Sequence, residues 1–329
     1  GKKRPRTRKS TRVLSGLGKY LIPGLIDSHV HLANVAGLNF RLKKANPELA
    51  AAYYKQMPKS YLYFGFTTLV DLNNHSPEVL KSILGSKFRP DIFTCGEQLE
   101  VMNGFMMADT KPQARYKNHP NFLHDRFKKN VSIPSDIDLD RHTPKARIKD
   151  IIRNQDGICT KIAFENGFGG TEDVTWEMPT KEIVKELTAE AGKMSVPVLM
   201  HANSFESQQF AYDTNVDIIA HGMWHWGKLT SYMKVKELPN QHKQLLEKIA
   251  KRRIGYQPTF RVIAGQRDVF DDNFIEDRNL QHVYPKQFLA WLKTEDGKWQ
   301  QNNIKKYAKG FFNGSFPDKK LESNSSIAF

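Results

Sequence analysis

Short apolar runs alternate with longer amphipathic stretches along the chain from residue 21 onward. Each run is too short for a helix and most contain β-branched residues, so we interpret the runs as strands that are buried on both faces. The seven runs are Leu21–Ile26, Phe66–Leu72, Asp91–Cys95, Ile158–Phe164, Val196–Met200, Val216–Ala220 and Ile254–Tyr256.

Helical patterns lie between several of these strands. Ser76, Pro77 and Glu78 form a helix start ahead of an apolar face, and Gly85 ends that helix. Two further apolar faces have helical spacing: Ile183, Val184, Leu187 and Ala191, ended by Gly192, and Leu245, Leu246 and Ile249.

Repeated strand–helix units predict parallel strands with right-handed crossovers, arranged as a closed barrel or as an open doubly wound sheet. Residues 326–329 would supply an eighth strand, and eight units favour the (β/α)8 barrel. Two long excursions interrupt the alternation. We expect residues 97–150 to form a long loop with short helices above the barrel mouth, and residues 261–325 to contain a helix at Gln287–Leu292.

Composition excludes several classes of protein. The 329 residues are 39% hydrophobic, enough for one large domain. No apolar run reaches the roughly 20 residues of a membrane span, and no signal peptide is visible. Cys95 and Cys159 do not make a disulfide framework or a metal-type pair, so they leave the cellular compartment open.

The net charge of +15 is unevenly distributed. Residues 1–12 hold seven basic side chains and no acid, so we interpret residues 1–17 as a basic, disordered arm, with nucleic-acid attachment as the alternative. Nothing downstream resembles a nucleic-acid-binding module. We therefore do not expect a nucleic-acid partner.

Four histidines fall at the carboxyl ends of predicted strands. His29 and His31 lie two residues apart, and this spacing on a strand directs both imidazoles to one face. His201 and His221 each follow an apolar run directly. Because (β/α)8 barrels place their active sites at this end, the pattern predicts a metal site.

Lys161 stands inside the fourth apolar run. A charged lysine that faces the interior of a barrel is costly unless it is paired or chemically modified. The pattern alone leaves two readings open: a modified interior lysine, or a lysine that faces outward or is simply paired.

Four segments together resemble strands of the amidohydrolase superfamily, in particular its imidazolonepropionase-like and prolidase-like branch. They are Gly18–His31 for the first strand, Gly65–Asp71 for the second, Val198–Ala202 for the fifth and Asp217–Gly222 for the sixth. The resemblance covers roughly residues 18–260. It implies a distorted (β/α)8 TIM barrel with one or two divalent metal ions, commonly zinc.

The resemblance also implies roles for the site residues. His29 and His31 would bind the more buried metal, His201 and His221 would bind the second, and Lys161 would be carboxylated to bridge the two. In such a site a metal pair activates water for attack on a carbonyl carbon. The expected reaction is hydrolysis of an amide, peptide or cyclic amide, with Lys161, His201 and His221 as catalytic residues.

The chain departs from the family pattern at two places. In the family an aspartate at the end of the eighth strand, often in Gly-Thr-Asp, binds metal and transfers the proton, whereas this chain ends at Phe329 and Asp318 precedes the expected strand. The small β-sandwich that accompanies the barrel in relatives is also expected to be largely missing. Residues 18–329 would then be a barrel that is incomplete at its eighth strand, in a chain shortened at both ends.

Substrate contacts are assigned to residues just beyond the strands. Asn203 and His225 could touch substrate or be surface polar groups, and Arg261 could bind a substrate carboxylate. We expect a small-molecule or short-peptide substrate, and the sequence leaves open whether the chain forms a homo-oligomer. The remaining histidines are expected to be exposed: His75, His119, His124, His142, His242 and His282.

Two other functions fit the same residues. One is an ester or phosphoester hydrolase that uses the same metal site. The other is a metal-binding but catalytically inactive barrel fragment, tethered to an acidic partner by its basic arm.

Overall fold

The structure is a computed structural model that describes residues 10, 12, 14–108, 110–167, 174–224, 237–259, 262 and 273–311. Strands and helices alternate along the chain, as the sequence predicts. The strands are β1 (Leu25–Val30), β2 (Phe66–Asp71), β3 (Asp91–Thr94), β4 (Thr160–Ala163), β5 (Val198–His201), β6 (Ile218–Ala220) and β7 (Gly255–Gln257). The α-helices are α1 (Phe40–Ala45), α2 (Pro47–Tyr63), α3 (Pro77–Leu84), α4 (Arg115–Asn118), α5 (Pro144–Asn154), α6 (Lys181–Lys193), α7 (Phe205–Asp213), α8 (Asn240–Arg252), α10 (Lys286–Leu292) and α11 (Glu295–Phe311).

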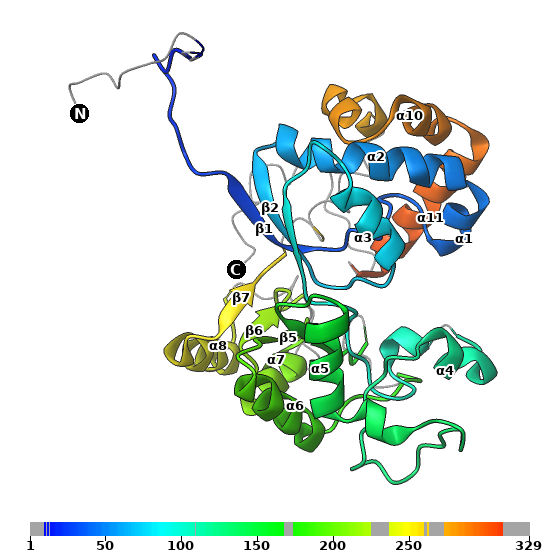
Figure 1. Ribbon diagram of the computed structural model, residues 1–329, viewed down its shortest axis with the longest axis vertical. Helices are drawn as coiled ribbons and strands as arrows, with labels where there is room; N and C mark the ends of the chain where they lie inside the picture. The colour runs from blue at the N-terminus through cyan, green and yellow to red at the C-terminus, as the bar shows by residue number, and fades with distance from the viewer. Residues whose placement is uncertain are drawn as a thin grey trace.

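The strands are parallel and follow one another in chain order within two sheets, β1-β2-β3 and β4-β5-β6-β7 (Figure 1). Isolated parallel bridges, Thr94 with Gly157 and Leu99 with Ile162, connect the two sheets. Sequential parallel strands with intervening helices are the architecture of a (β/α)8 barrel. The fold is therefore that of a barrel, with seven strands in the described part of the chain; the predicted strand at 326–329 lies outside it.

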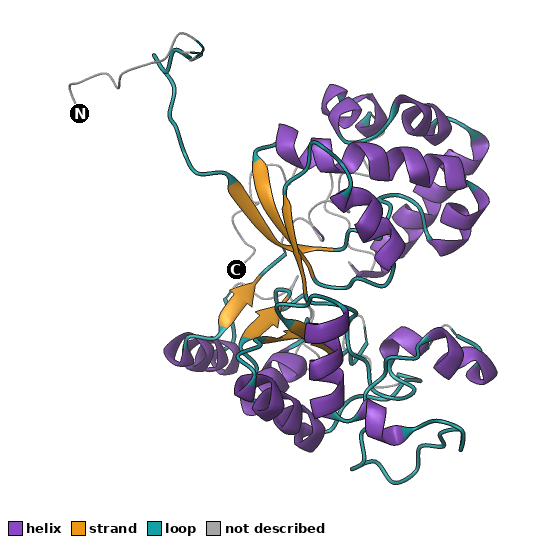
Figure 2. Cartoon of the chain, in the orientation of Figure 1, coloured by secondary structure: helices purple, strands orange, loops and turns teal. Residues whose placement is uncertain are grey.

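Helices α5, α6, α7 and α8 cover the sheet β4–β7 (Figure 2). The predicted apolar face of α6 is confirmed, since Ile183, Leu187 and Ala191 are fully buried in the core beneath β4 and β5. Thr180 caps this helix by accepting a hydrogen bond from the backbone N–H of Ile183 at 3.3 Å. Packing of this kind fixes the strands that carry most of the site.

Helices α2, α3 and α10 pack around the sheet β1–β3. The predicted helix in the second excursion is present as α10, and its Phe288 is buried against Tyr53 of α2. The second excursion therefore returns to the N-terminal half of the barrel (Figure 1).

Two predictions about element boundaries were wrong. The first strand starts at Leu25 rather than Leu21, because Tyr20 and Leu21 pack against nothing in the described structure and are fully exposed. The first excursion is not only loop and short helices: its last part is α5, an eleven-residue helix that connects β3 to β4. Its polar composition concealed an amphipathic face, in which Ile148 and Ile151 are buried.

Cys95 and Cys159 form a disulfide, with a Cα–Cα distance of 4.3 Å. Cys95 follows β3 and Cys159 precedes β4, so the adjacency of two strands unites cysteines that are 64 residues apart. The sequence analysis did not pair them, because spacing along the chain carries no information about neighbouring strands.

Among the described residues no helix is long and apolar enough to cross a membrane. Residues 14–24 lead into β1 from outside the body of the barrel, and most of the predicted arm at 1–17 lies outside the described residues (Figure 1). The described strands pair only in parallel, so no β-sandwich is present in this part of the chain.

Candidate functional site

The five predicted metal ligands all lie at one end of the barrel. His29 is near the end of β1 and His31 follows it, Lys161 is in β4, His201 ends β5, and His221 follows β6 directly. Parallel strands bring their carboxyl ends to the same edge of the barrel. The order of strands therefore gathers side chains that are up to 192 residues apart in sequence.

These five side chains form one histidine–lysine cluster. The ring centroids of His29 and His31 are 5.4 Å apart, those of His29 and His221 are 4.8 Å apart, and those of His201 and His221 are 4.6 Å apart. Lys161 Nζ lies 3.4 Å from His29 Nε2. The structure thus brings together every residue that the sequence predicts as a metal ligand.

Three of the four imidazoles have one nitrogen held by a neighbouring residue. His29 Nδ1 lies 3.0 Å from Gln257 Oε1, and His201 Nε2 lies 2.7 Å from Glu165 Oε2. His221 Nδ1 lies 3.1 Å from the Thr259 hydroxyl. A partner on one ring nitrogen fixes the ring orientation and leaves the other nitrogen for a ligand, which is the usual arrangement around protein metal sites.

The backbone at His221 has a strained conformation. His221 has φ of 86°, and its partner Thr259 has φ of 47°. Left-handed backbone at non-glycine residues costs on the order of 1–3 kcal/mol and concentrates at functional sites. The His221 backbone N–H donates to the carbonyl of Gln257, the last residue of β7, and the Gly222 N–H donates to the Pro258 carbonyl, so these two bonds hold the conformation in place.

Burial keeps the imidazoles neutral. Burial, followed by the charges of Lys161 and His31, lowers the pKa of His29 to about 2, and burial with the Lys161 charge lowers the pKa of His31 to about 3. Burial also lowers the pKa of His201 and lowers that of His221 well below its usual range. Neutral imidazole is the form of histidine that binds metals.

Lys161 is 1% exposed, which rules out the outward-facing reading. Burial lowers its pKa to about 7, against the opposing effect of the Asp71 charge. Asp71 lies at the end of β2, and burial raises the pKa of its carboxyl to about 6. Its buried Oδ2 has no hydrogen-bond partner among the described residues.

The donor set suits a divalent metal ion. Neutral imidazoles suit zinc and other transition metals, and a buried carboxylate oxygen without a partner can be satisfied by a cation. The described residues contain no group of three or more His, Cys, Asp or Glu side chains already positioned to hold a metal. The residues thus fit a metal by their chemistry and proximity, and Lys161 stands among them.

Sequence reasoning missed four residues of this site: Asp71, Glu165, Gln257 and Thr259. All four lie at or just past the end of a strand, the same signal that identified the histidines. The Glu165 side chain is fully buried. Its Oε2 lies 2.7 Å from His201 Nε2 and accepts a hydrogen bond from the Asn203 amide, while Oε1 accepts one from the Gly167 backbone N–H.

Aromatic side chains border the cluster. Phe105 stacks against His201 at 6.2 Å and packs edge-on against Trp176 at 5.2 Å, while Trp224 lies 4.7 Å from His221. All three aromatic side chains are partly exposed. Phe105 comes from the first excursion, which thereby contributes a wall of the site.

The three predicted substrate residues have different outcomes. Asn203 is completely buried and its amide donates to Glu165 Oε2 at 2.8 Å, so it is not a surface polar group. His225 and Arg261 lie outside the described residues. Contact of these three residues with substrate stays a prediction.

Two histidines that were expected to be exposed are buried. His142 stacks on Phe122 at 3.9 Å, and its Nδ1 lies 2.9 Å from the Phe122 carbonyl oxygen. His242 is buried on α8 against Phe205. In both cases an aromatic neighbour that is distant in sequence covers the ring, which local sequence does not reveal.

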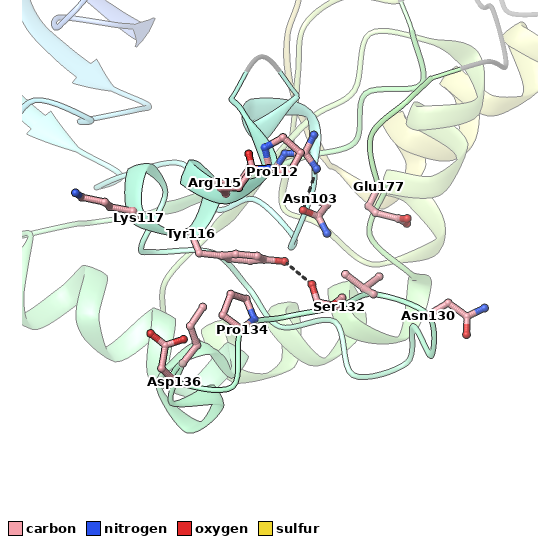
Figure 3. Close-up of a pocket in the computed structure, with 13 residues that line it drawn as sticks. Asn103, Pro112, Arg115, Tyr116, Lys117, Asn130, Ser132, Pro134, Asp136 and Glu177 are labelled. Atoms are coloured by element: carbon pink, nitrogen blue, oxygen red, sulfur yellow. Dashed lines mark hydrogen bonds between the residues drawn. The ribbon is translucent and has the colours of Figure 1, made fainter.

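A surface groove of about 940 Å³ lies in the first excursion, lined mainly by residues 112–117 and 130–137 (Figure 3). Its lining includes Tyr116, whose hydroxyl donates to the Ser132 carbonyl, and Arg115, which donates to Asn103. No residue of the histidine–lysine cluster lines it. Glu177, which lines the groove, forms a parallel bridge with Gly104, the residue before Phe105.

Comparisons with known proteins show the family and the fold of the chain. The sequence matches the amidohydrolase family over residues 20–236. The chain is similar in fold to an amidohydrolase (TM-score 0.54, 17% identity, 92% of this chain and 67% of that chain covered) and to molinate hydrolase (0.53, 16%, 94% and 77%). It is also similar to a prolidase crystallised with N-methylphosphonate-L-proline (0.51, 15%, 94% and 67%).

No curated protein sequence matches the chain. The family match nevertheless spans well over half of the chain and includes all five residues of the cluster. The chain therefore belongs to the amidohydrolase family and is a hydrolase of carbon–nitrogen bonds.

Proposed function

We propose that this protein is a metal-dependent hydrolase that cleaves an amide, peptide or cyclic amide bond in a small molecule or short peptide. The observation that carries the proposal is the histidine–lysine cluster itself: four neutral imidazoles and one buried lysine at the carboxyl end of the barrel. The cluster occupies the place where such barrels carry out their chemistry.

His29 and His31 would hold one divalent ion, and His201 and His221 would hold a second. When bound, zinc or a similar ion would polarise the scissile carbonyl and activate water. Gln257, Glu165 and Thr259 orient the imidazoles through the nitrogens they hold.

Lys161 would be carboxylated and bridge the two ions. Its lowered pKa supports this proposal, because an uncharged amine is the form that adds to carbon dioxide. The reaction joins the amine nitrogen to the carbon of carbon dioxide and releases one proton, which leaves an anionic oxygen ligand. It also removes the buried positive charge that makes Lys161 costly in the unmodified chain.

The aromatic wall favours an uncharged, apolar group beside the scissile bond. The partly exposed rings of Phe105 and Trp224 lie next to His201 and His221, and that of Trp176 packs against Phe105. Apolar contact with aromatic faces gains free energy roughly in proportion to the buried area. A prolidase of similar fold was crystallised with N-methylphosphonate-L-proline, a small ligand with an apolar proline ring, which agrees with this choice.

The test combines elemental mass spectrometry of the purified protein with a panel of amide, ester and phosphoester substrates. We expect one to two equivalents of zinc or a similar metal, and hydrolysis of amides. His201→Ala and His221→Ala should each remove about one equivalent and lower kcat/KM by at least about 100-fold, with the far-ultraviolet circular dichroism unchanged.

His119→Ala is the matched control, since His119 contacts Thr110 in the first excursion and no residue of the cluster. It should retain metal and activity. Full metal content and full rate in either cluster variant would overturn the assignment of the second metal. Cleavage of esters or phosphoesters without any amide would instead favour the alternative substrate class, and bound metal without any hydrolysis would favour an inactive barrel.

A further inference from the structure

Glu100 is a buried acid to which the proposed function gives no role. It lies near the start of the first excursion and is 4% exposed. Oε1 accepts a hydrogen bond from the Val101 backbone N–H at 3.1 Å, and Oε2 accepts one from the Met106 N–H at 3.2 Å. The Phe105 N–H also hydrogen-bonds to this carboxyl. Residues 100–107, which we call the wall segment, therefore fold around a single carboxyl group.

The wall segment has no free space between its backbone and this carboxyl. A Cβ atom at Gly104 would lie 2.1 Å from Glu100 Oε1, closer than nonbonded atoms approach each other. Met102 and Met107 of the same segment are buried in a small apolar cluster. The Glu100 carboxyl thus fills the inside of a closely packed turn, and the absence of a side chain at position 104 makes room for it.

Two anchors tie the wall segment to other parts of the chain. Just before it, the Leu99 backbone N–H donates to the Lys161 carbonyl of β4 at 2.7 Å. Within it, Gly104 forms a parallel bridge with Glu177. These anchors hold the segment at its start and at one point along it, while the Glu100 carboxyl holds the turn itself.

Phe105 is the residue at which the wall segment meets the histidine–lysine cluster. Its ring stacks on that of His201, with the centroids 6.2 Å apart and the ring planes inclined by 24°. Trp176 packs edge-on against it at 5.2 Å. Because Phe105 is partly exposed, its own packing encloses only part of the ring, and its placement depends on the backbone that Glu100 holds. Buried support of this kind fixes a functional side chain more precisely than its own contacts do.

We propose that Glu100 is a positioning residue: its buried carboxyl holds the wall segment folded, keeps Phe105 against His201, and so sets the preference of the site for an apolar substrate group. The part that concerns the placement of Phe105 stands on the structure alone, and the part that concerns substrate preference rests on the proposed function. A carboxyl retains acceptor capacity in both of its protonation states, so it can hold these N–H groups whether or not it is ionised.

The first measurement locates Phe105 without substrate or metal. The protein is labelled with fluorotryptophan, and Trp176→Phe assigns the Trp176 signal among those of the five tryptophans in fluorine NMR spectra. Phe105→Leu removes the ring that Trp176 contacts, and the shift of the Trp176 signal in this variant defines the scale. An unchanged signal in Phe105→Leu would mean that the two rings are not in contact in solution, and the proposal would fail at this step.

Glu100→Leu keeps the approximate volume of the side chain but accepts no hydrogen bonds, so buried backbone N–H groups lose their partner. We expect the Trp176 signal of this variant to move by more than half of the shift seen in Phe105→Leu. Glu100→Gln retains one acceptor oxygen and should move the signal much less. If Glu100→Leu does not fold, Gly104→Ala supplies the test, because its Cβ displaces the same carboxyl. A wild-type Trp176 signal in the folded variant would overturn the proposal.

The second measurement is substrate preference. The amine of the best amide substrate is acylated with a phenylacetyl or an acetyl group, and kcat and KM are determined for both amides. We expect the wild type to prefer the phenylacetyl amide, and Glu100→Leu to lower that preference about 5- to 10-fold, a change typical of one lost aromatic contact. The loss should appear in KM, because a contact with the wall is made equally in the ground state and the transition state.

The variant Phe105→Leu separates this role from a general loss of stability. Adding Glu100→Leu to Phe105→Leu should cause no further loss of preference, because the contact through which Glu100 acts is already gone. Additive losses, a loss confined to kcat, or an equal loss for both amides would each contradict the proposal.

Glu97→Leu is the matched control. Glu97 is an acid of the same excursion, but its carboxylate accepts a hydrogen bond from the Asn121 side chain, outside the wall segment. This variant should keep both the wild-type Trp176 signal and the wild-type preference. Equal effects of Glu97→Leu and Glu100→Leu would mean that Glu100 only stabilises the fold, and the proposal would be wrong.

The proposed function and the role of Glu100 can fail separately. If the metal-loaded wild type hydrolyses no amide, the proposed function is overturned, while the Trp176 signal still decides the role of Glu100. If amides are hydrolysed but Glu100→Leu retains the wild-type Trp176 signal and preference, the function stands and the inference fails.

Discussion

The two halves of the barrel differ in regularity. In the half formed by β4–β7, the strands pair without any register shift, and all four residues of β4 are buried. In the half formed by β1–β3, the pairing of β1 with β2 shifts register twice, and Leu25 and Ile26 of β1 are exposed. The two halves belong to one fold but differ in the regularity of their strand pairing.

This difference matters because the site draws on both halves. Lys161, His201 and His221 lie on the regular half, whereas His29 lies inside the second register shift of β1. Within this irregular part of the strand, the His29 backbone N–H donates to Asp27 Oδ1 at 3.1 Å, and the His29 side chain meets Gln257 and Lys161 of the other half. The position of His29 therefore depends on contacts from the other half.

The halves meet at two seams. At the first, between β3 and β4, the Cys95–Cys159 disulfide lies beside the Thr94–Gly157 bridge. At the second, between β7 and β1, the Gln257 side chain reaches Ser28 and His29. The contacts at each seam can be removed by separate substitutions. The resulting changes in stability test how far the half formed by β1–β3 depends on contacts with the half formed by β4–β7.

The largest effect is expected at the first seam. Removing the disulfide with Cys95→Ala and Cys159→Ala together frees a loop of 64 residues in the unfolded chain, which by loop entropy lowers the free energy of unfolding by about 4 kcal/mol. Urea unfolding of the oxidised wild type and of the double variant measures this difference. We expect the metal content to be retained, because neither cysteine contacts the histidine–lysine cluster.

Reduction of the wild type under denaturing conditions, followed by refolding, supplies the control, since it should reproduce the stability of the double variant. Thiol titration verifies the redox state at each step. Equal stability of the oxidised and reduced proteins would show that the first seam is held by packing and backbone hydrogen bonds alone.

The sequence predicts the regular half better than the irregular one. The strand at Ile218–Ala220 lies within its predicted run, and the strand at Val198–His201 extends only one residue beyond its run, because both have short, strongly apolar cores. The first strand was displaced by four residues, since Leu21 and Ile22 are apolar yet contribute nothing to the described core. Apolarity predicts burial only where a neighbouring element covers the residue.

The candidate site shows the same limit. Histidines could be found because their residue type is informative at a strand end. Glu165 and Gln257 could not, because an acid or amide at a strand end is ordinary until the structure shows which imidazole it meets. Contacts between residues as distant as His29 and Gln257 follow from strand order, which local pattern does not encode.

A second, smaller effect at the first seam depends on pH. Burial raises the pKa of Glu100 to about 8, against the opposing backbone hydrogen bonds from Met106 and Val101. The folded protein thus binds this proton more tightly than the unfolded chain, where the pKa is 4.5. The stabilisation is complete below about pH 4.5 and is lost as the pH rises toward about 8.

We expect the wild type to lose about 3.5 kcal/mol of unfolding free energy through this group between pH 5 and pH 8. Glu100→Gln, which resembles the protonated acid, should show a flatter dependence when urea unfolding is repeated across that range. Glu190→Gln is the matched control on the surface of α6, and it should follow the wild type. Parallel curves for wild type and Glu100→Gln would contradict this reading of Glu100.

The smallest effect on stability, and the most local one, is expected at the second seam. Gln257 donates to the Ser28 carbonyl at 2.9 Å and lies 3.0 Å from His29 Nδ1, so Gln257→Ala removes the side-chain contacts that join β7 to β1. The variant should lose about 1 kcal/mol, the usual net contribution of such hydrogen bonds. Because β1 is the irregular strand, the loss of stability should be concentrated there. Amide hydrogen exchange in Leu25–Val30 should become faster, while exchange in Val198–His201 stays as in the wild type.

Gln209→Ala is the control: it removes a comparable hydrogen bond within α7, to Asp213, and should leave exchange in both strands unchanged. Equal acceleration in both strands would mean that the two halves open as one unit, and no acceleration in β1 would mean that packing against β2 holds His29 in position without help from the regular half.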